Sequence, residues 1–333
     1  MIEDELRAAF ARHEADTPAA GPVRDKIDSA WVRAKRRRTW RRTVGAAAVV
    51  ALAVAVAPAV FGAYRGSGPA LPVAGSTTAP AGPVDVLLLG SDHRQQWEAG
   101  HQRADTVMLL HLTADRKQVY LVSLPRGGML PTGEKLNETL MRGPAVTRAA
   151  VQALTGVDID ATVTVGLPAL TGITAAVGGV PICLKQGIVA NGGRKALPAG
   201  CQEIGPDEVR PLIQGRIRLP NGSYDRDAHN RAFLRSLAAK VTADGTGLDE
   251  LQALLAAAKN GIEVDGDTTS LLRLAASLSA PETIGIGARS AAGGHEGSRT
   301  EAIYPEVGPA LYTAIREDRL AEWARANPDY VDG

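Results

Sequence analysis

The sequence predicts an α/β domain, a mixed β-sheet with helices on both faces, preceded by one transmembrane helix. Short apolar runs end in glycine or proline, as buried strands do where they lead into loops. Segments with helical patterning alternate with these runs, and one uncharged run near the N-terminus is long enough to cross a bilayer. Aromatic residues make up only 4% of the 333 residues, so the core must be built from small aliphatic side chains.

The uncharged run at residues 43–63 matches the thickness of the hydrocarbon core of a membrane. Basic residues crowd the stretch directly before it: Arg33, Lys35, Arg36, Arg37, Arg38, Arg41 and Arg42. The positive-inside rule therefore predicts a single-pass protein of the cell membrane, with a cytoplasmic N-terminus and an extracytoplasmic C-terminal domain. A cleaved signal peptide is disfavoured because Pro58 would follow the cut. Topology also explains the basic cluster better than nucleic-acid binding does.

Composition divides the chain into segments. We expect a cytoplasmic basic juxtamembrane segment at 1–42, the transmembrane helix at 43–63, a flexible linker at 64–83, an extracytoplasmic domain at 84–285, and a C-terminal loop and helix at 286–333 that complete or extend this domain. The terminal helix is expected over residues 310–327.

The two cysteines, Cys183 and Cys201, flank a glycine-rich loop. In an exported domain, two thiols so placed favour a disulfide. The alternative is a pair of buried, unpaired thiols.

Charged residues adjoin the predicted strands where these strands end or begin. The apolar run at residues 84–90 leads into a loop that carries Asp92 and Arg94. Arg103 and Asp105 come directly before the next apolar run. Two predicted strands thus bracket two clusters of aspartate and arginine.

A third apolar run ends at Pro125, with Arg126 directly behind it. This sequence places another guanidinium group at a strand end. Strand ends are where α/β domains usually carry their chemistry.

Helical patterning follows at residues 145–154 and 169–177, strand patterning at 180–184, and a short helix at 207–212. Arg216 and Arg218 then alternate, so an extended segment would point both guanidinium groups to the same side.

A cluster of Arg226, Asp227, His229 and Arg231 is expected to precede an amphipathic helix that begins near Ala232. The start of this helix would itself favour anions.

Arginines and aspartates in this arrangement predict an anionic ligand, a phosphate, with a divalent cation that bridges carboxylate and phosphate. The competing interpretation is that these arginines are ordinary surface residues or members of salt bridges. A zinc site at His93 and His101 lacks a third ligand. A serine hydrolase is disfavoured because Ser123 lacks the glycine context of a nucleophile elbow.

The order of the motifs resembles the LytR-CpsA-Psr family of cell-wall enzymes, from about residue 84 to about residue 280. The motifs that carry the resemblance are LLLGSDHR, RADTVMLL, VSLPR, VGGV, LPAGCQEI, RIR and YDRDAHNRAFL. The resemblance implies a phosphotransferase that moves a glycopolymer from an undecaprenyl-pyrophosphate carrier to peptidoglycan through a phosphodiester bond. It implies Mg²⁺ as cofactor, with the lipid-linked glycopolymer, peptidoglycan and membrane lipid as partners, and no nucleic acid.

By position, Asp92 and Asp105 match the family's Mg²⁺-associated carboxylates. The arginines that match its pyrophosphate contacts are Arg94, Arg103, Arg126, Arg216, Arg218 and Arg226. The resemblance makes Asp92 and Arg126 the catalytic candidates.

Two positions depart from the family pattern. Gly127 stands where the family usually carries Asp, and Ala228 and His229 occupy the place of a further arginine, with Arg231 close enough to reach back. Either Asp92 or a bound water activates the acceptor, or the protein only binds polyprenyl-pyrophosphate lipids. Transcriptional regulation is a third hypothesis, disfavoured because the short cytoplasmic side shows no recognition helix.

Overall fold

The computed structural model describes residues 82–92, 102–189, 196–215, 219–242, 261–267, 281–288 and 307–332, with a few positions between 253 and 278. The predicted cytoplasmic segment, transmembrane helix and most of the predicted linker lie outside these residues. Among the residues that are described, no helix has both the length and the apolar character needed to cross a bilayer.

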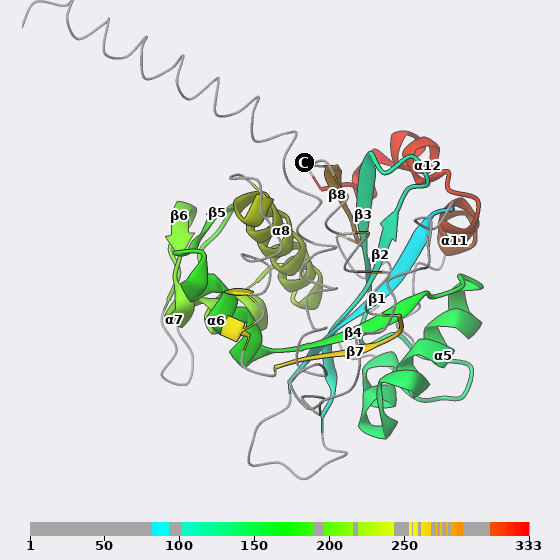
Figure 1. Cartoon of the computed structure of the whole chain (residues 1–333), viewed down its shortest axis with the longest axis horizontal. Helices are drawn as coiled ribbons and strands as arrows, with labels where there is room; N and C mark the ends of the chain where they lie inside the picture. Colours follow the sequence, from blue (N-terminus) through cyan, green and yellow to red (C-terminus); the bar gives the residue numbers. More distant parts are fainter. Residues whose placement is uncertain are drawn as a thin grey trace, which may run out of the picture. The chain divides into compact units, whose positions relative to one another are not determined.

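The domain is organised around a mixed sheet in the order β7-β4-β1-β2-β3-β8 (Figure 1). Its strands are β1 (Val84–Ser91), β2 (Ala104–Leu112), β3 (Gln118–Leu124), β4 (Ala161–Gly166), β7 (Ile262–Asp265) and β8 (Glu282–Ile286). Strands β1, β2 and β3 form an antiparallel meander. Strand β4 runs parallel to β1, and β8 runs parallel to β3, whereas β7 is antiparallel to β4.

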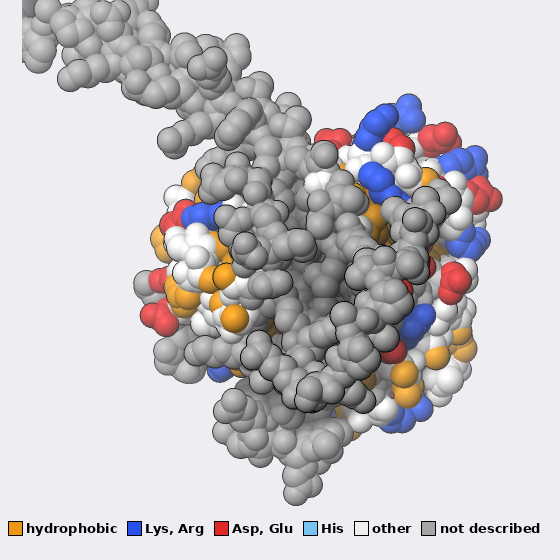
Figure 2. Space-filling view, in the orientation of Figure 1, with side chains coloured by type: hydrophobic (Ala, Val, Ile, Leu, Met, Phe, Trp, Pro, Cys, Tyr) orange, Lys and Arg blue, Asp and Glu red, His pale blue; other side chains and the backbone are white. Residues whose placement is uncertain are grey.

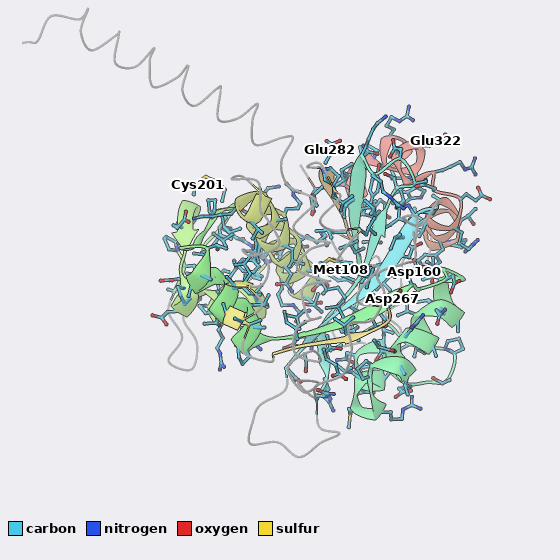
Figure 3. The ribbon with its side chains drawn as sticks, viewed as in Figure 1. Met108, Asp160, Cys201, Asp267, Glu282 and Glu322 are labelled. Carbon is cyan, nitrogen blue, oxygen red and sulfur yellow. A yellow bond between two sulfur atoms is a disulfide. The ribbon has the colours of Figure 1, made fainter. Side chains whose placement is uncertain are left out.

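Helices cover both faces of this sheet, as the sequence predicted (Figure 1). One face packs against α6 (Leu167–Ala176), α7 (Pro206–Gln214) and α8 (Ser223–Thr242), and the other against η1 (Leu136–Arg142), α5 (Pro144–Thr155), α11 (Gly308–Arg316) and α12 (Leu320–Ala326). The central strands are apolar on both sides because both sides are buried. Met108 of β2, for example, faces the core shared with α8 (Figure 3).

A separate two-stranded hairpin, β5 (Val180–Leu184) and β6 (Gly200–Ile204), lies on the same side as α8 (Figure 1). Cys183 and Cys201 stand opposite each other in its register and are joined by a disulfide. Both residues are exposed, so the alternative of two buried thiols is wrong.

The C-terminal part departs from the expected single helix. Helix α11 ends at Arg316 and α12 begins at Leu320, and the break includes Asp318, which has a φ of 52°. After α12 and the short η2 (Pro328–Tyr330), Val331 forms an antiparallel bridge with Ile286. Residues 330–332 therefore lie along β8, an edge strand of the sheet.

Candidate functional site

The strand ends bring three of the predicted site residues to one end of the sheet. Strand β1 ends at Ser91 and β3 ends at Leu124, while the antiparallel β2 begins at Ala104 between them. Asp92 and Arg126 follow the two strands that end there, and Asp105 stands near the start of β2. The sequence alone indicated this arrangement, because each charge adjoins an apolar run.

An irregularity in the β1–β2 register places Asp105. Gly90 pairs with Thr106, and Ser91 pairs with Ala104, which leaves Asp105 without a partner across the ladder. Such a bulge bends the strand and re-aims the extra side chain, and bulges are common beside functional sites. Asp105 is thereby released from the sheet pattern and bonds to residues on other elements.

Asp105 gathers contacts from three elements. Its Oδ1 accepts a hydrogen bond from Arg126 Nη1 at 2.8 Å, and its Oδ2 accepts one from Gln214 Nε2 at 3.4 Å. Arg226 Nη1 lies 4.0 Å from the same Oδ1. The side chains of Asp105 and Arg126 are each about one-fifth exposed, so this pair remains accessible to a ligand.

Arg226 lies inside α8, which begins at Ser223, so the predicted helix start near Ala232 is wrong. The arginine is only 1% exposed and donates to Asp227 Oδ1 from Nη2 at 2.9 Å. A buried guanidinium group needs such pairing, because an unpaired buried charge is very costly. Asp227 thus neutralises Arg226 on one side, while Nη1 of Arg226 approaches Asp105 on the other.

Asp92 closes the loop between β1 and β2. Its backbone N–H donates to Arg103 O at 3.1 Å, and its Oδ1 accepts from Arg103 N at 2.7 Å. Burial raises the pKa of Asp92, the hydrogen bond from Arg103 opposes this shift, and the nearby charge of Asp105 adds to it. Among the described residues, none donates to Asp92 Oδ2, so this oxygen is available as a ligand.

This pair of carboxylates suits a hard divalent cation. Asp92 and Asp105 are close enough for the charge of Asp105 to raise the pKa of Asp92, and a bound cation would relieve that repulsion. The described part of the chain holds no cluster of three or more acidic, histidine or cysteine ligands. Mg²⁺ does not need one, because it commonly binds one or two carboxylates together with substrate phosphates.

Several predicted residues lie outside the described part of the chain: Arg94, Arg216, Arg218, His93 and His101. Arg103 contributes its backbone to Asp92.

The structure does not bring Arg231 to Asp92 or Asp105. Arg231 instead donates to Ser123 on β3 and to Asp332 near the C-terminus.

Two polar contacts near the site were not foreseen. Gln214 carried no sequence signal, because it lies beyond the short helix predicted at residues 207–212. Asn230 donates from Nδ2 to Thr106 Oγ1 at 2.7 Å and so ties α8 to β2 next to Asp105. The spacing of four residues between Arg226 and Asn230 would have placed them on one helix face, had the true start of α8 been recognised.

The fold and the site together define a class: an α/β protein that gathers carboxylates and arginines at one end of a mixed sheet. The sequence model of the LytR_cpsA_psr family matches residues 68–304. The chain belongs to this family.

Two of the similar curated proteins are named for cell-wall biosynthesis and for teichoic acid transfer. The chain is 26% identical over 233 residues to cell wall biosynthesis protein LcpA of Corynebacterium glutamicum, covering 55% of this chain and 45% of that protein. It is 26% identical over 164 residues to the polyisoprenyl-teichoic acid–peptidoglycan teichoic acid transferase TagU of Bacillus mycoides, covering 47% and 52%. The chain thus spans about half the length of these curated relatives.

The crystal structure of protein gbs0355 from Streptococcus agalactiae has a similar fold, with a TM-score of 0.60 and 18% identity. The match covers 72% of this chain and 88% of that one.

Proposed function

We propose that the protein is a phosphotransferase that moves a glycopolymer from an undecaprenyl-pyrophosphate carrier to peptidoglycan, with Mg²⁺, at the outer face of the cell membrane. The cluster of Asp105, Arg126 and Arg226 at the strand ends carries this proposal. The names of LcpA and TagU support cell-wall assembly, a polyisoprenyl-linked donor and transfer to peptidoglycan. The predicted transmembrane helix at 43–63 would hold the domain next to its lipid substrate.

The chemistry follows from the arrangement of charge. Arginine binds phosphate oxygens in a bidentate manner, and Asp105 holds Arg126 in a defined orientation. Arg226 is held by Asp227 in the same way. Groups fixed in advance stabilise the charge that develops on a phosphate without reorganising during the reaction.

The reaction itself exchanges one oxygen on phosphorus for another. A hydroxyl of peptidoglycan attacks the phosphorus that carries the glycopolymer, a new P–O bond forms, and the bond to the bridging oxygen breaks. Polyprenyl phosphate leaves with the bond's electrons, and the hydroxyl proton passes to a base. Asp92 is the candidate base, because its Oδ2 is unbonded among the described residues. Asp92 and Asp105 would hold Mg²⁺, which would supply positive charge to neutralise the pyrophosphate.

Gly127 favours a second candidate function, binding of polyprenyl-pyrophosphate lipids without transfer. The family usually carries an acidic residue at this position, directly after Arg126. Gly127 is not among the glycines with positive φ, so its backbone would accept an aspartate side chain.

The deciding experiment measures transfer of a lipid-pyrophosphate glycan to peptidoglycan by the full chain, with Mg²⁺ and with chelator. We expect transfer that requires Mg²⁺ and that falls about 10²-fold or more in Arg126→Ala. Arg142→Ala is the matched control, because Arg142 lies in the next element but is exposed and bonds only to Glu134 among the described residues.

The outcomes separate the two functions. Binding of the lipid without transfer, together with transfer in Gly127→Asp, would favour the binder that has lost its acidic residue. Neither binding nor transfer in any variant would contradict both proposals.

A further inference from the structure

Helix α8, which carries Arg226, is attached to the sheet along two different flanks. Arg226 and Asn230 are four residues apart and share one flank, which faces Asp105 and Thr106. Arg231 is five residues from Arg226 and is therefore turned by about 140° around the helix axis. This second flank faces β3 and β8.

The second flank is held by an ion pair between a buried arginine of α8 and a partly exposed aspartate of the C-terminal segment. Arg231 is 2% exposed, and it donates from Nε and Nη2 to the two oxygens of Asp332 at 2.7 and 2.8 Å. Its Nη1 donates to Ser123 Oγ on β3 at 2.7 Å. Arg235, one helical turn further on, lies 3.9 Å from Asp332. A bidentate pair of this kind fixes the orientation of both side chains.

Asp332 is itself fixed by the edge of the sheet. Its N–H donates to Gly285 O at 2.9 Å, and Gly287 N–H donates to Tyr330 O at 2.9 Å. Together with the bridge between Ile286 and Val331, these bonds add the chain end to β8. The carboxylate that receives Arg231 is thus held by backbone bonds.

Gly285 on β8 and Gly287 directly after this strand leave the space that the pair occupies. A Cβ on Gly285 would lie 2.0 Å from Asp332 Oδ2, and a Cβ on Gly287 would lie 2.1 Å from Arg231 Nη1. Neither glycine has a positive φ, so it is space, and not backbone conformation, that requires glycine here. The close fit indicates a specific contact between α8 and the chain end.

We infer that Asp332 is a positioning residue: through Arg231 it fixes the rotation of α8 and so places Arg226 beside Asp105. This inference rests on the proposed function, since it assigns Asp332 to the site that binds pyrophosphate. The family match ends at residue 304, before this segment. A displacement of about 1 Å at a reacting centre is enough to reduce a rate about 10²-fold, so loss of the pair should reach the site.

The test compares four full-length proteins: wild type, Asp332→Asn, Arg226→Ala and the double variant. Geranyl pyrophosphate with Mg²⁺ is the binding probe, and hydrogen exchange reports on the backbone of α8. We expect Asp332→Asn to weaken probe binding about tenfold or more, and to add nothing once Arg226 is alanine, because both changes act through one group. It should also speed amide exchange within residues 223–235.

Two further variants guard against simple misfolding. Arg231→Gln combined with Asp332→Asn leaves no buried unpaired charge and should show the same loss of binding with the thermal midpoint largely retained. Gly287→Ala disturbs Arg231 without altering any charge and should act in the same direction. Asp329→Asn is the matched control, an exposed aspartate three residues earlier, and should bind as wild type does.

The outcomes distinguish this inference from the proposed function. Unchanged α8 exchange in Asp332→Asn, or losses of binding that simply add in the double variant, would overturn the positioning role. Wild type that fails to bind the probe, with α8 exchange altered in Asp332→Asn, would instead count against the pyrophosphate site and leave the coupling of α8 to the chain end supported.

Discussion

Two clusters of acidic and basic side chains stand at opposite ends of the β1–β2 pair, and they differ in how far their basic residue is exposed to solvent. At one end, Asp105 and Arg126 meet with about one-fifth of each side chain exposed. At the other end, His111 is fully buried, with its Nδ1 2.9 Å from Asp85 and its Nε2 2.9 Å from Asp318.

We call Asp85, His111 and Asp318 the sealed cluster, because His111 and Asp85 are buried, whereas Asp318 is about one-quarter exposed. Asp318 also accepts a hydrogen bond from Ala114 N–H, and Asp85 N–H donates to Asp160, which Figure 3 labels. Burial lowers the pKa of His111, but the hydrogen bonds and charges of Asp85 and Asp318 outweigh it, so the pKa lies above its ordinary value. The cluster joins the central strands to the break between α11 and α12.

The comparison shows how one sheet uses similar charges for two purposes. A sealed charge pair connects parts of the fold, and removing one member is expensive because the other stays buried. A partly exposed pair adds little stability, since water screens it, but it remains available to a ligand. On the face in Figure 2, the described acidic and basic side chains around α11 and α12 are interspersed, as on an ordinary solvated surface.

The largest expected effect is on stability at the sealed end. His111→Leu should lower the free energy of unfolding by about 3–5 kcal/mol, because it leaves Asp85 and Asp318 without their shared cation. Urea denaturation would measure this loss, while transfer per folded molecule should be unchanged. Arg319→Ala, which breaks an exposed pair with Glu317, is the control and should cost less than about 1 kcal/mol. Equal losses in the two variants would contradict the distinction between the clusters.

The reverse pattern is expected at the open end. Asp105→Asn should lower transfer about 10²-fold, because Arg126 loses its orienting carboxylate, yet change the free energy of unfolding by no more than about 1 kcal/mol. Steady-state rates and urea denaturation on the same preparation would show both. Asp207→Asn, at an exposed position on the helix that carries Gln214, should alter neither quantity. A variant that transfers normally would remove Asp105 from the site.

The smallest expected effect is a dependence of stability on pH. Because the pKa of His111 is raised in the folded state, its pairing stabilises the protein fully below the ordinary value of about 6.5. This stabilisation is lost as the pH rises through the higher folded-state pKa. Burial also raises the pKa of Asp85 from 3.8, which makes stability depend on pH in the acid range. Measurements confined to pH 6–9 keep this contribution of Asp85 small.

Denaturation curves across this range should therefore show wild type losing stability with rising pH, and His111→Leu losing distinctly less. Parallel curves for the two proteins would mean that His111 does not hold its proton more tightly in the folded state.

Much of the sheet was predictable because its central strands are apolar on both faces, which gives continuous runs such as residues 84–90. Strand β4 alternates threonine with small apolar residues, and β8 contains Gly285. Neither segment was therefore recognised as a strand from the sequence alone. Helix α8 was placed too late because polar side chains fill its first two turns. Two of these side chains, Arg226 and Asn230, are buried where they meet Asp105 and Thr106 of β2, which local sequence does not reveal.

Asp92, Asp105 and Arg126 were predictable as site candidates because each lies next to a strand end in the sequence. The partners that orient them were not, since they depend on contacts between distant segments. Gln214 reaches Asp105 across 109 residues, and Asn230 reaches Thr106 across 124. The His111 cluster was missed for the same reason, because Asp318 lies 207 residues further along the chain.

The bond between Arg231 and Asp332 also affects the order in which parts of the domain can fold during synthesis. The two residues are 101 positions apart, so Arg231 is synthesised well before its carboxylate partner. A nascent chain that already contains Asp92, Asp105, Arg126 and Arg226 still lacks the residue that holds α8 in place. Domains with such long-range pairings fold slowly and expose unpaired segments meanwhile. If Asp332 has the positioning role that we infer, the proposed site is fixed only after translation has passed residue 332.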